Sequence, residues 1–145
     1  MEYTEFTQDK IPEVVDLFMQ AFNNSSWGDS WTPETVIKRL MQMTGRPSDD
    51  GLICKKDGKP VGLILGTEEQ YDREIHFTIK EFCTHPDFKG QGIGKNLLAE
   101  FEKRLKGKGI DKIFLMTIEG EGTVGVYGKF GYVKSDGMVM MEKKL

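Results

Sequence analysis

The stretch HPDFKGQGIGKNLL, residues 85–98, decides the fold, because it crowds glycine into the start of an apolar helix pattern. In order, its glycines and the basic residues beside them are Lys89, Gly90, Gly92, Gly94 and Lys95. Glycine allows positive φ and a close approach of backbone to ligand. The first turn of a helix leaves four N–H groups without partners and carries about half a positive charge. The stretch therefore predicts an anion site suited to phosphate, reinforced by the two lysines.

Counting excludes two common phosphate-binding loops. The Walker loop needs four residues between its first glycine and the Gly-Lys pair, and then Ser or Thr. Here three residues separate Gly90 from the Gly94-Lys95 pair, and Asn96 follows the pair. The dinucleotide fingerprint needs two residues after its second glycine, whereas Ile93 alone fills that interval. A plain connecting turn would need fewer glycines and no flanking lysines.

The residues before the glycines predict two helices and several strands. The expected elements are strand 3–6, helix 11–22, helix 32–43, a hairpin over 51–68 and strand 73–84. Thr32 and Pro33 are typical of a helix start, and Asp57-Gly58 is typical of a hairpin turn. Regular alternation in the last strand would place five side chains on one face: Ile75, Phe77, Ile79, Glu81 and Cys83.

The residues after the glycines complete the pattern. Apolar spacing predicts a helix from Ile93 to about Leu105, followed by strand 111–118, a short glycine-interrupted helix or turn over 121–131 and a last strand over 137–145. A strand, a loop, a helix and a strand within about 35 residues form a parallel βαβ crossover. Together with the antiparallel hairpin, the crossover predicts a mixed sheet covered by helices.

Composition narrows the function. The net charge of −3 gives no electrostatic footprint for nucleic acid and suits a cationic substrate only weakly. Cys54 and Cys83 lie in apolar strands, which indicates reduced core thiols. His76 and His85 lack partners at metal-ligand spacing, so no metal site is expected. Residues 1–10 show no secretory signal, and no apolar run nears the roughly 20 residues of a membrane span, so a cytoplasmic protein is expected.

The glycine stretch resembles the acetyl-CoA-binding signature of the GNAT superfamily of acyl-CoA N-acyltransferases, (Gln/Arg)-x-x-Gly-x-(Gly/Ala) after a strand and a Pro-containing turn. Lys89 stands where Gln or Arg is usual, and family members use the backbone N–H at that position. The resemblance implies acetyl-CoA as donor, bound by Phe82, Cys83, Thr84, Lys89, Gly90, Gln91, Gly92, Ile93, Gly94 and Lys95. It also implies an α/β (α+β) fold in a single domain over 1–145: a mixed, mostly antiparallel sheet with helices on both faces and a central parallel crossover.

The C-terminal part resembles the same family. Members of that family usually have the sequence Tyr-x-x-x-Gly-Phe before a final strand. Tyr127, Gly131 and Tyr132 fit this spacing. Glu121 replaces an Asn that is frequent there, so no coenzyme contact is implied for that side chain. The implied activity is transfer of an acetyl group to a primary amine by direct attack in a ternary complex.

Such a transfer needs a neutral amine, stabilisation of an oxyanion and a proton for the departing thiolate. Tyr127 matches the general-acid tyrosine of the family by position. Glu81, charged on an apolar strand face, is a candidate base or substrate anchor; the alternative is an ion pair with a neighbouring Lys or Arg. The resemblance implies oxyanion stabilisation by backbone N–H groups near residues 82–84, where family members splay two strands. No histidine is placed to make Cys83 a nucleophile.

The acceptor is expected among the variable segments. Trp27 and Trp31 are candidates for an aromatic wall and Asp29 for an amine partner, although large side chains there also suit packing over the helices. Glu69 and Tyr71 belong to an acidic segment that is either an acceptor cleft or a solvated loop. These groups suit a polyamine, an aminoglycoside-like amine or a peptide or protein amine.

Other interpretations stay open. The same fold accepts a longer acyl-CoA, or serves as a non-catalytic coenzyme A sensor, which would have no need for a phenol at Tyr127. The strand over 137–145 suits pairing across a homodimer and equally suits an ordinary edge strand.

Overall fold

The computed structural model describes residues 1–24, 28–120 and 122–145, so Trp27 and Glu121 lie outside the described residues. Its strands and helices are β1 (Glu2–Glu5), α1 (Ile11–Asn23), α2 (Pro33–Met41), β2 (Asp49–Lys56), β3 (Lys59–Gln70), β4 (Ile75–Thr84), α3 (Ile93–Gly107), β5 (Lys112–Leu115) and α4 (Val124–Gly128). Two 3-10 turns, η1 (Gln8–Lys10) and η2 (Pro86–Phe88), precede α1 and α3.

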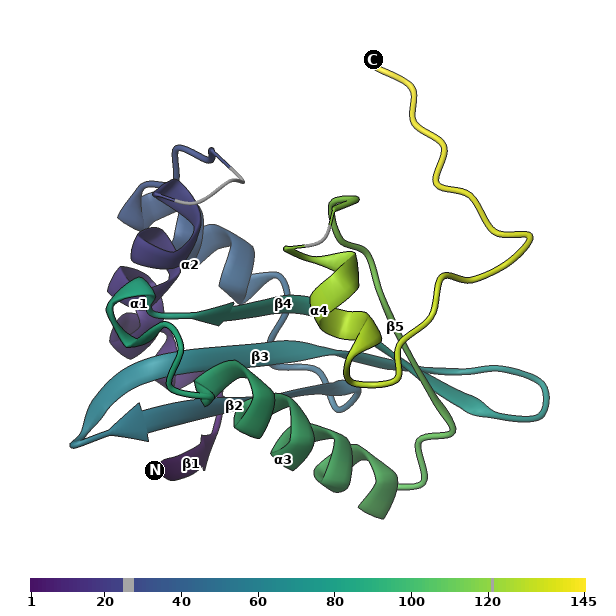
Figure 1. The fold of residues 1–145 in the computed structure, drawn as a ribbon, viewed down its shortest axis with the longest axis horizontal. Helices are drawn as coiled ribbons and strands as arrows, with labels where there is room; N and C mark the ends of the chain where they lie inside the picture. Colours follow the sequence, from purple (N-terminus) through teal and green to yellow (C-terminus); the bar gives the residue numbers. More distant parts are fainter. Residues whose placement is uncertain (25–27, 121) are drawn as a thin grey trace.

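The strands form one five-stranded sheet in the order β1-β2-β3-β4-β5 (Figure 1). Its first three pairs are antiparallel, and β4 pairs with β5 in parallel. Helix α3 connects the two parallel strands, because parallel neighbours need a crossover. The predicted mixed, mostly antiparallel sheet with a βαβ crossover is confirmed.

The sheet separates two apolar cores. Helices α1 and α2 bury Phe18 and Leu40 against one face, together with Leu63 of β3. Helix α3 buries Leu97 and Phe101 against the other face, where α4 also packs. Each helix carries an apolar stripe at helical spacing, and burying that stripe supplies the driving force for the layers.

The predicted start of the second helix and the predicted hairpin turn are both present. The Thr32 hydroxyl accepts a hydrogen bond from the Thr35 N–H at 3.2 Å, which caps α2 ahead of Pro33. Asp57 and Gly58 both have positive φ, 50° and 77°, as a two-residue hairpin turn requires.

Strand β4 does not alternate regularly, so the prediction of one shared face is wrong. Leu65 pairs with Glu81 whereas Gly66 pairs with Ile79, which leaves Lys80 as an extra residue. Such a bulge reverses the direction of the side chains that follow it. Ile79 therefore lies in the core beneath α3, whereas Glu81 faces α2.

The predicted last strand over 137–145 is also wrong. Residues 133–145 carry no helix or strand and run away from the sheet (Figure 1). Met138 to Met141 are between 74% and 88% exposed. Val favours extended backbone locally, but a strand forms only when an edge pairs with it. Among the described residues, this segment makes no hydrogen bond to β5. Pairing across a homodimer stays a prediction.

Cys54 and Cys83 are free and buried, which confirms reduced core thiols. Strand β5 is shorter than predicted and only half-buried. Among the described residues, no helix is long and apolar enough to cross a membrane, and no three His, Cys, Asp or Glu side chains gather around a possible metal position.

The bulge gives a prediction for stability. A Cβ atom at Gly66 would lie 2.0 Å from the Thr78 carbonyl oxygen, so Gly66→Ala should force the β3–β4 ladder apart. We expect a loss of about 3 kcal/mol of unfolding free energy in urea denaturation. Gly107→Ala is the control, because nothing lies within 4 Å of the added atom at the end of α3. Equal unfolding midpoints for the two variants would contradict this account.

Candidate functional site

Strands β4 and β5 part after a short parallel ladder. Their pairing ends at Ile79 and Leu115, although β4 continues to Thr84. Between residues 80 and 84, β4 is therefore paired only with β3 among the described strands. The far edge of this part of β4 faces a gap.

The phase of the β3–β4 ladder decides which backbone groups face that gap. The His85 N–H donates to the Val61 carbonyl at 2.9 Å. In an antiparallel ladder, alternate residues bond to the same neighbour. Cys83 therefore bonds toward β3, whereas the N–H and C=O groups of Phe82 and Thr84 point into the gap.

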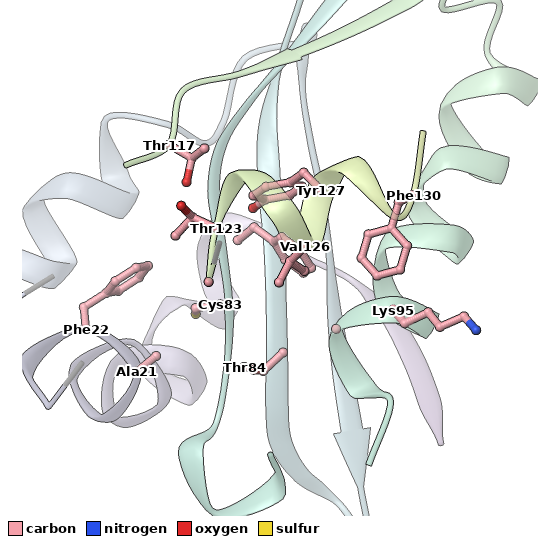
Figure 2. A pocket seen from close by; sticks show the side chains of 13 residues that line it. Ala21, Phe22, Cys83, Thr84, Lys95, Thr117, Thr123, Val126, Tyr127 and Phe130 are labelled. Atoms are coloured by element: carbon pink, nitrogen blue, oxygen red, sulfur yellow. The ribbon is translucent and has the colours of Figure 1, made fainter. Parts of the chain in front are cut away.

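A pocket of about 340 Å³ fills this gap (Figure 2). Its walls come from α1, β4, the start of α3, the segment after β5 and α4; the residues are Ala21, Phe22, Phe82, Cys83, Thr84, Gly94, Lys95, Thr117, Gly122, Thr123, Val126, Tyr127 and Phe130. Six of the expected site residues thus meet here: five proposed for the donor, and Tyr127.

The glycine stretch opens α3 at the rim of the pocket. Gly92 is the N-cap with φ of 76°, and the first helical hydrogen bond runs from the Asn96 N–H to the Gly92 carbonyl at 3.0 Å. The amides of the first turn are thus unused by the helix. A Cβ at Gly94 would lie 3.5 Å from the Thr84 side chain, so the start of α3 is in near contact with β4. This arrangement can hold an anion next to the gap.

The side chains of the stretch contribute less than its backbone. Ile93 is 2% exposed and packs in the core, so only its backbone N–H is available to a ligand. The ammonium group of Lys95 points away from the pocket (Figure 2). Lys89 is exposed, and the exposed Gln91 accepts a hydrogen bond from Lys56 at 2.9 Å.

Tyr127 extends from α4 across the pocket, with its hydroxyl toward the wall that carries Thr123 (Figure 2). Its ring lies 6.2 Å from that of Phe82 and 5.7 Å from that of Tyr132. Burial, with a smaller contribution from Cys83, raises the pKa of Tyr127 to about 12. The phenol is therefore protonated at neutral pH and can donate a proton.

Cys83 of β4 lines the same pocket as the phenol of Tyr127. Burial, with a smaller effect of Glu81, raises the pKa of its thiol well above the ordinary value. A protonated, buried thiol is a poor nucleophile. That Cys83 does not act as a nucleophile stays a prediction from the sequence.

Glu81 is paired with Arg39 of α2, as one interpretation of the sequence anticipated. Its side chain is 10% exposed and that of Arg39 is 39% exposed. Burial raises the pKa of Glu81 above its ordinary value, Arg39 opposes the rise and Asp29 adds to it. Two residues of strand place Glu81 about 7 Å from Cys83 and the pocket wall.

Asp29 and Trp31, just before α2, are held by contacts that begin at α1. Trp31 packs its ring edge-on against Phe18, with centroids 5.1 Å apart, and its Nε1–H donates to Asp29 at 2.9 Å. Asn23 accepts a hydrogen bond from the Trp31 N–H and donates to its carbonyl, at 2.7 and 2.9 Å. Trp31 is thus a packing residue that also positions Asp29.

The structure does not bring the other expected acceptor residues to the pocket. Glu69 is exposed and lies opposite His76 in the ladder. Tyr71 is 48% exposed and stacks on His76 with ring centroids 4.1 Å apart. Both lie beyond the bulge from Glu81.

Sequence reasoning missed several residues of this region. Arg39 follows Val36 by three positions on α2, and this spacing was a usable sign that it lies beside the buried face. Phe22 belongs to the apolar stripe of α1, and such a stripe predicts core packing rather than a pocket wall. Thr117 and Thr123 lie in connecting segments, where no periodic signal exists.

Known proteins share this fold and sequence pattern. The sequence profile of the Acetyltransferase (GNAT) family matches residues 11–132. An acetyltransferase of Sodalis glossinidius is 28% identical over 146 residues, spanning 100% of this chain and 96% of its own. One from Pectobacterium atrosepticum is 30% identical over 137 residues, spanning 94% and 90%. The crystal structure of a possible acetyltransferase from Clostridium difficile superposes with a TM-score of 0.84 at 15% identity, covering 99% and 97%.

Because the family profile covers most of its length, the chain belongs to the acetyltransferase (GNAT) family. The resemblance stated from the sequence is confirmed, and the protein is an acyltransferase.

The environment of Glu81 predicts a pH dependence. If Glu81 is the base, kcat rises with pH through its pKa, because only the carboxylate accepts a proton. Burial raises that pKa, so this limb should lie above the ordinary 4.5. Glu81→Gln should remove the limb from a profile of kcat against pH measured with saturating substrates.

Glu102→Gln is the matched control for this measurement. Burial also raises the pKa of Glu102, which accepts a hydrogen bond from Tyr132 on the α3 side of the sheet. Its profile should coincide with that of the wild type. An unchanged limb in Glu81→Gln would remove Glu81 as the base.

Proposed function

We propose that the protein transfers an acetyl group from acetyl-CoA to a primary amine while both substrates are bound. The observation that carries this proposal is the meeting of three features at one pocket: the unused amides at the start of α3, the unpaired edge of β4 and the buried phenol of Tyr127.

The start of α3 fits the pyrophosphate of coenzyme A. Gly90 and Gly92 have positive φ of 81° and 76°, and nothing lies within 4 Å of a Cβ built on Gly90. Backbone amides and the helix dipole favour an anion there. Lys89 and Lys95 add positive charge at the edge, and β4 then supplies a path from this anion site to the pocket.

Bound acetyl-CoA would supply the acetyl group as a thioester. In the transfer, the amine nitrogen forms an N–C bond to the acyl carbon and the C–S bond of the thioester breaks. The N–H groups of Phe82 and Thr84 face the gap and can stabilise negative charge on the acyl oxygen. Tyr127 can donate its proton to the departing sulfur. Glu81 can accept the proton that the amine must lose, directly or through water.

The acceptor side of the site is assigned to the α1–α2 loop and the exposed half of the sheet. Asp29 is held by the Trp31 ring, raises the pKa of Glu81, and offers a second carboxylate to an amine. Trp31 shapes this edge, and Trp27 belongs to the same loop. Glu69 and Tyr71 would contact only an acceptor long enough to pass the bulge.

Acetyl-CoA should stabilise the protein against heat. A ligand at 100 times its Kd adds about 2.7 kcal/mol, which corresponds to a rise in Tm of about 5 to 10 °C for a domain of this size. Gly92→Asp should abolish the shift, because it places a carboxylate in the anion site. Gly137→Asp makes the same charge change at a similar φ of 78° in the exposed tail and should keep the shift. No shift in the wild type at millimolar acetyl-CoA would refute the donor assignment.

Replacing Tyr127 by Phe should lower kcat by about 100-fold while leaving the Kd of acetyl-CoA unchanged, because general acids contribute on this scale. The measurement is steady-state release of free thiol alongside direct binding of acetyl-CoA. Tyr132→Phe is the control, since this neighbouring phenol bonds to Glu102 at 3.4 Å rather than facing the pocket. Equal kcat values for wild type and Tyr127→Phe would exclude the phenol from the reaction.

A further inference from the structure

Arg39 has unused hydrogen-bonding capacity beside the site. A guanidinium carries five N–H donors. Among the described residues, the guanidinium of Arg39 bonds only to Glu81, through Nε. The Nε–H bond to Glu81 leaves its two Nη groups free. Its side chain is 39% exposed, against 10% for Glu81. Arg39, which carries the free groups, is thus the more exposed partner of the pair.

Two carboxylates belong to the same region as Arg39. Glu81 lies next to it, and Asp29 is near enough to raise the pKa of Glu81 further. Asp29 is fixed in place through its bond to the Trp31 ring, which α1 holds. Two carboxylates and one guanidinium are thus set at the same end of the sheet face that carries Cys83.

The pair is poorly explained as a device for stability. Exposed and buried ion pairs alike add little to folding, because screening by water or the cost of removing charges from water offsets their attraction. Here one partner also keeps N–H donors that no described protein group accepts. An arrangement of this kind is suited to a ligand that carries both charges.

We propose that Arg39 is a specificity-determining residue that binds a carboxylate of the acceptor, so that the acceptor is a zwitterion of the amino-acid type. This inference rests on the proposed function. The acceptor ammonium lies between Glu81 and Asp29, and its carboxylate accepts two N–H groups from the free edge of the guanidinium. Arg39 then orients the amine next to the base. Polyamines and aminoglycosides carry no carboxylate and are disfavoured as acceptors.

The first test needs no variant. Common α-amino acids and their carboxamides are compared as acceptors with saturating acetyl-CoA, by release of free thiol. Loss of a charge-assisted bidentate contact should make kcat/KM about 10- to 100-fold lower for a carboxamide than for its acid. A carboxamide also lowers the pKa of the adjacent amine. The rates are therefore compared at one pH, after each acceptor concentration is corrected to its fraction of neutral amine.

The second test locates the effect. Arg39→Gln should bring the acid-to-amide ratio close to one, and Arg39→Lys should restore part of it. Arg46→Gln is the control, because it removes the same charge from another arginine. Arg46 pairs with Asp49 at a distance of 2.9 Å and does not line the pocket. Its ratio should match the wild type. The assays use a pH at which kcat is constant, since Arg39 also affects the pKa of Glu81.

Equal rates for acids and amides, or a ratio that Arg39→Gln leaves unchanged, would overturn the proposal. So would acetylation of polyamines or aminoglycosides with no acetylation of amino acids, and in that case the proposed acetyltransferase function would stand. Failure of the proposed function itself is recognised separately, by absence of the thermal shift with acetyl-CoA.

Discussion

The parting of β4 from β5 is the constraint on which the rest of the structure depends. The parallel ladder covers only His76 to Ile79 on β4, and the bulge at Lys80 follows at once. Beyond it the amides of Phe82 and Thr84 lack a neighbouring strand, and the chain after β5 diverges to form the opposite wall. Helix α3, which must span the crossover, begins beside this opening with its dipole toward the gap. The pocket is thus a consequence of backbone topology more than of any one side chain.

Burial then differentiates the titratable groups around the pocket. It raises the pKa of Tyr127, Cys83 and Glu81 alike, because each neutral form is favoured away from water. Of these three groups, Glu81 alone has a cation beside it in the part of the chain that the structure describes, and Arg39 opposes the effect of burial. One low-polarity region therefore contains a phenol and a thiol that keep their protons and a carboxylate whose ionised form is supported. Such contrasts between neighbouring groups are typical of acid–base sites.

Much of this architecture was readable from the sequence, because local rules act there. Helical spacing, the Asp57-Gly58 turn and the glycines before α3 each depend on a few adjacent residues, and the family resemblance added Tyr127. The bulge at Lys80 depends instead on how β3 meets β4, which no single strand records. The strand predicted over 137–145 failed for the same reason, since propensity cannot provide a partner edge. The pairing of Arg39 with Glu81 joins residues 42 positions apart and needed the fold to appear.

The sheet that separates the two cores also acts as a partition between the two proposed reactants. The anion site lies with α3 on one face, and the carboxylates with Arg39 lie with α2 on the other. The two faces meet at the pocket where β4 and β5 have parted, so the two proposed reactants would approach it from opposite sides. A layout of this kind permits binding in either order, and it lets one product leave while its partner is still held.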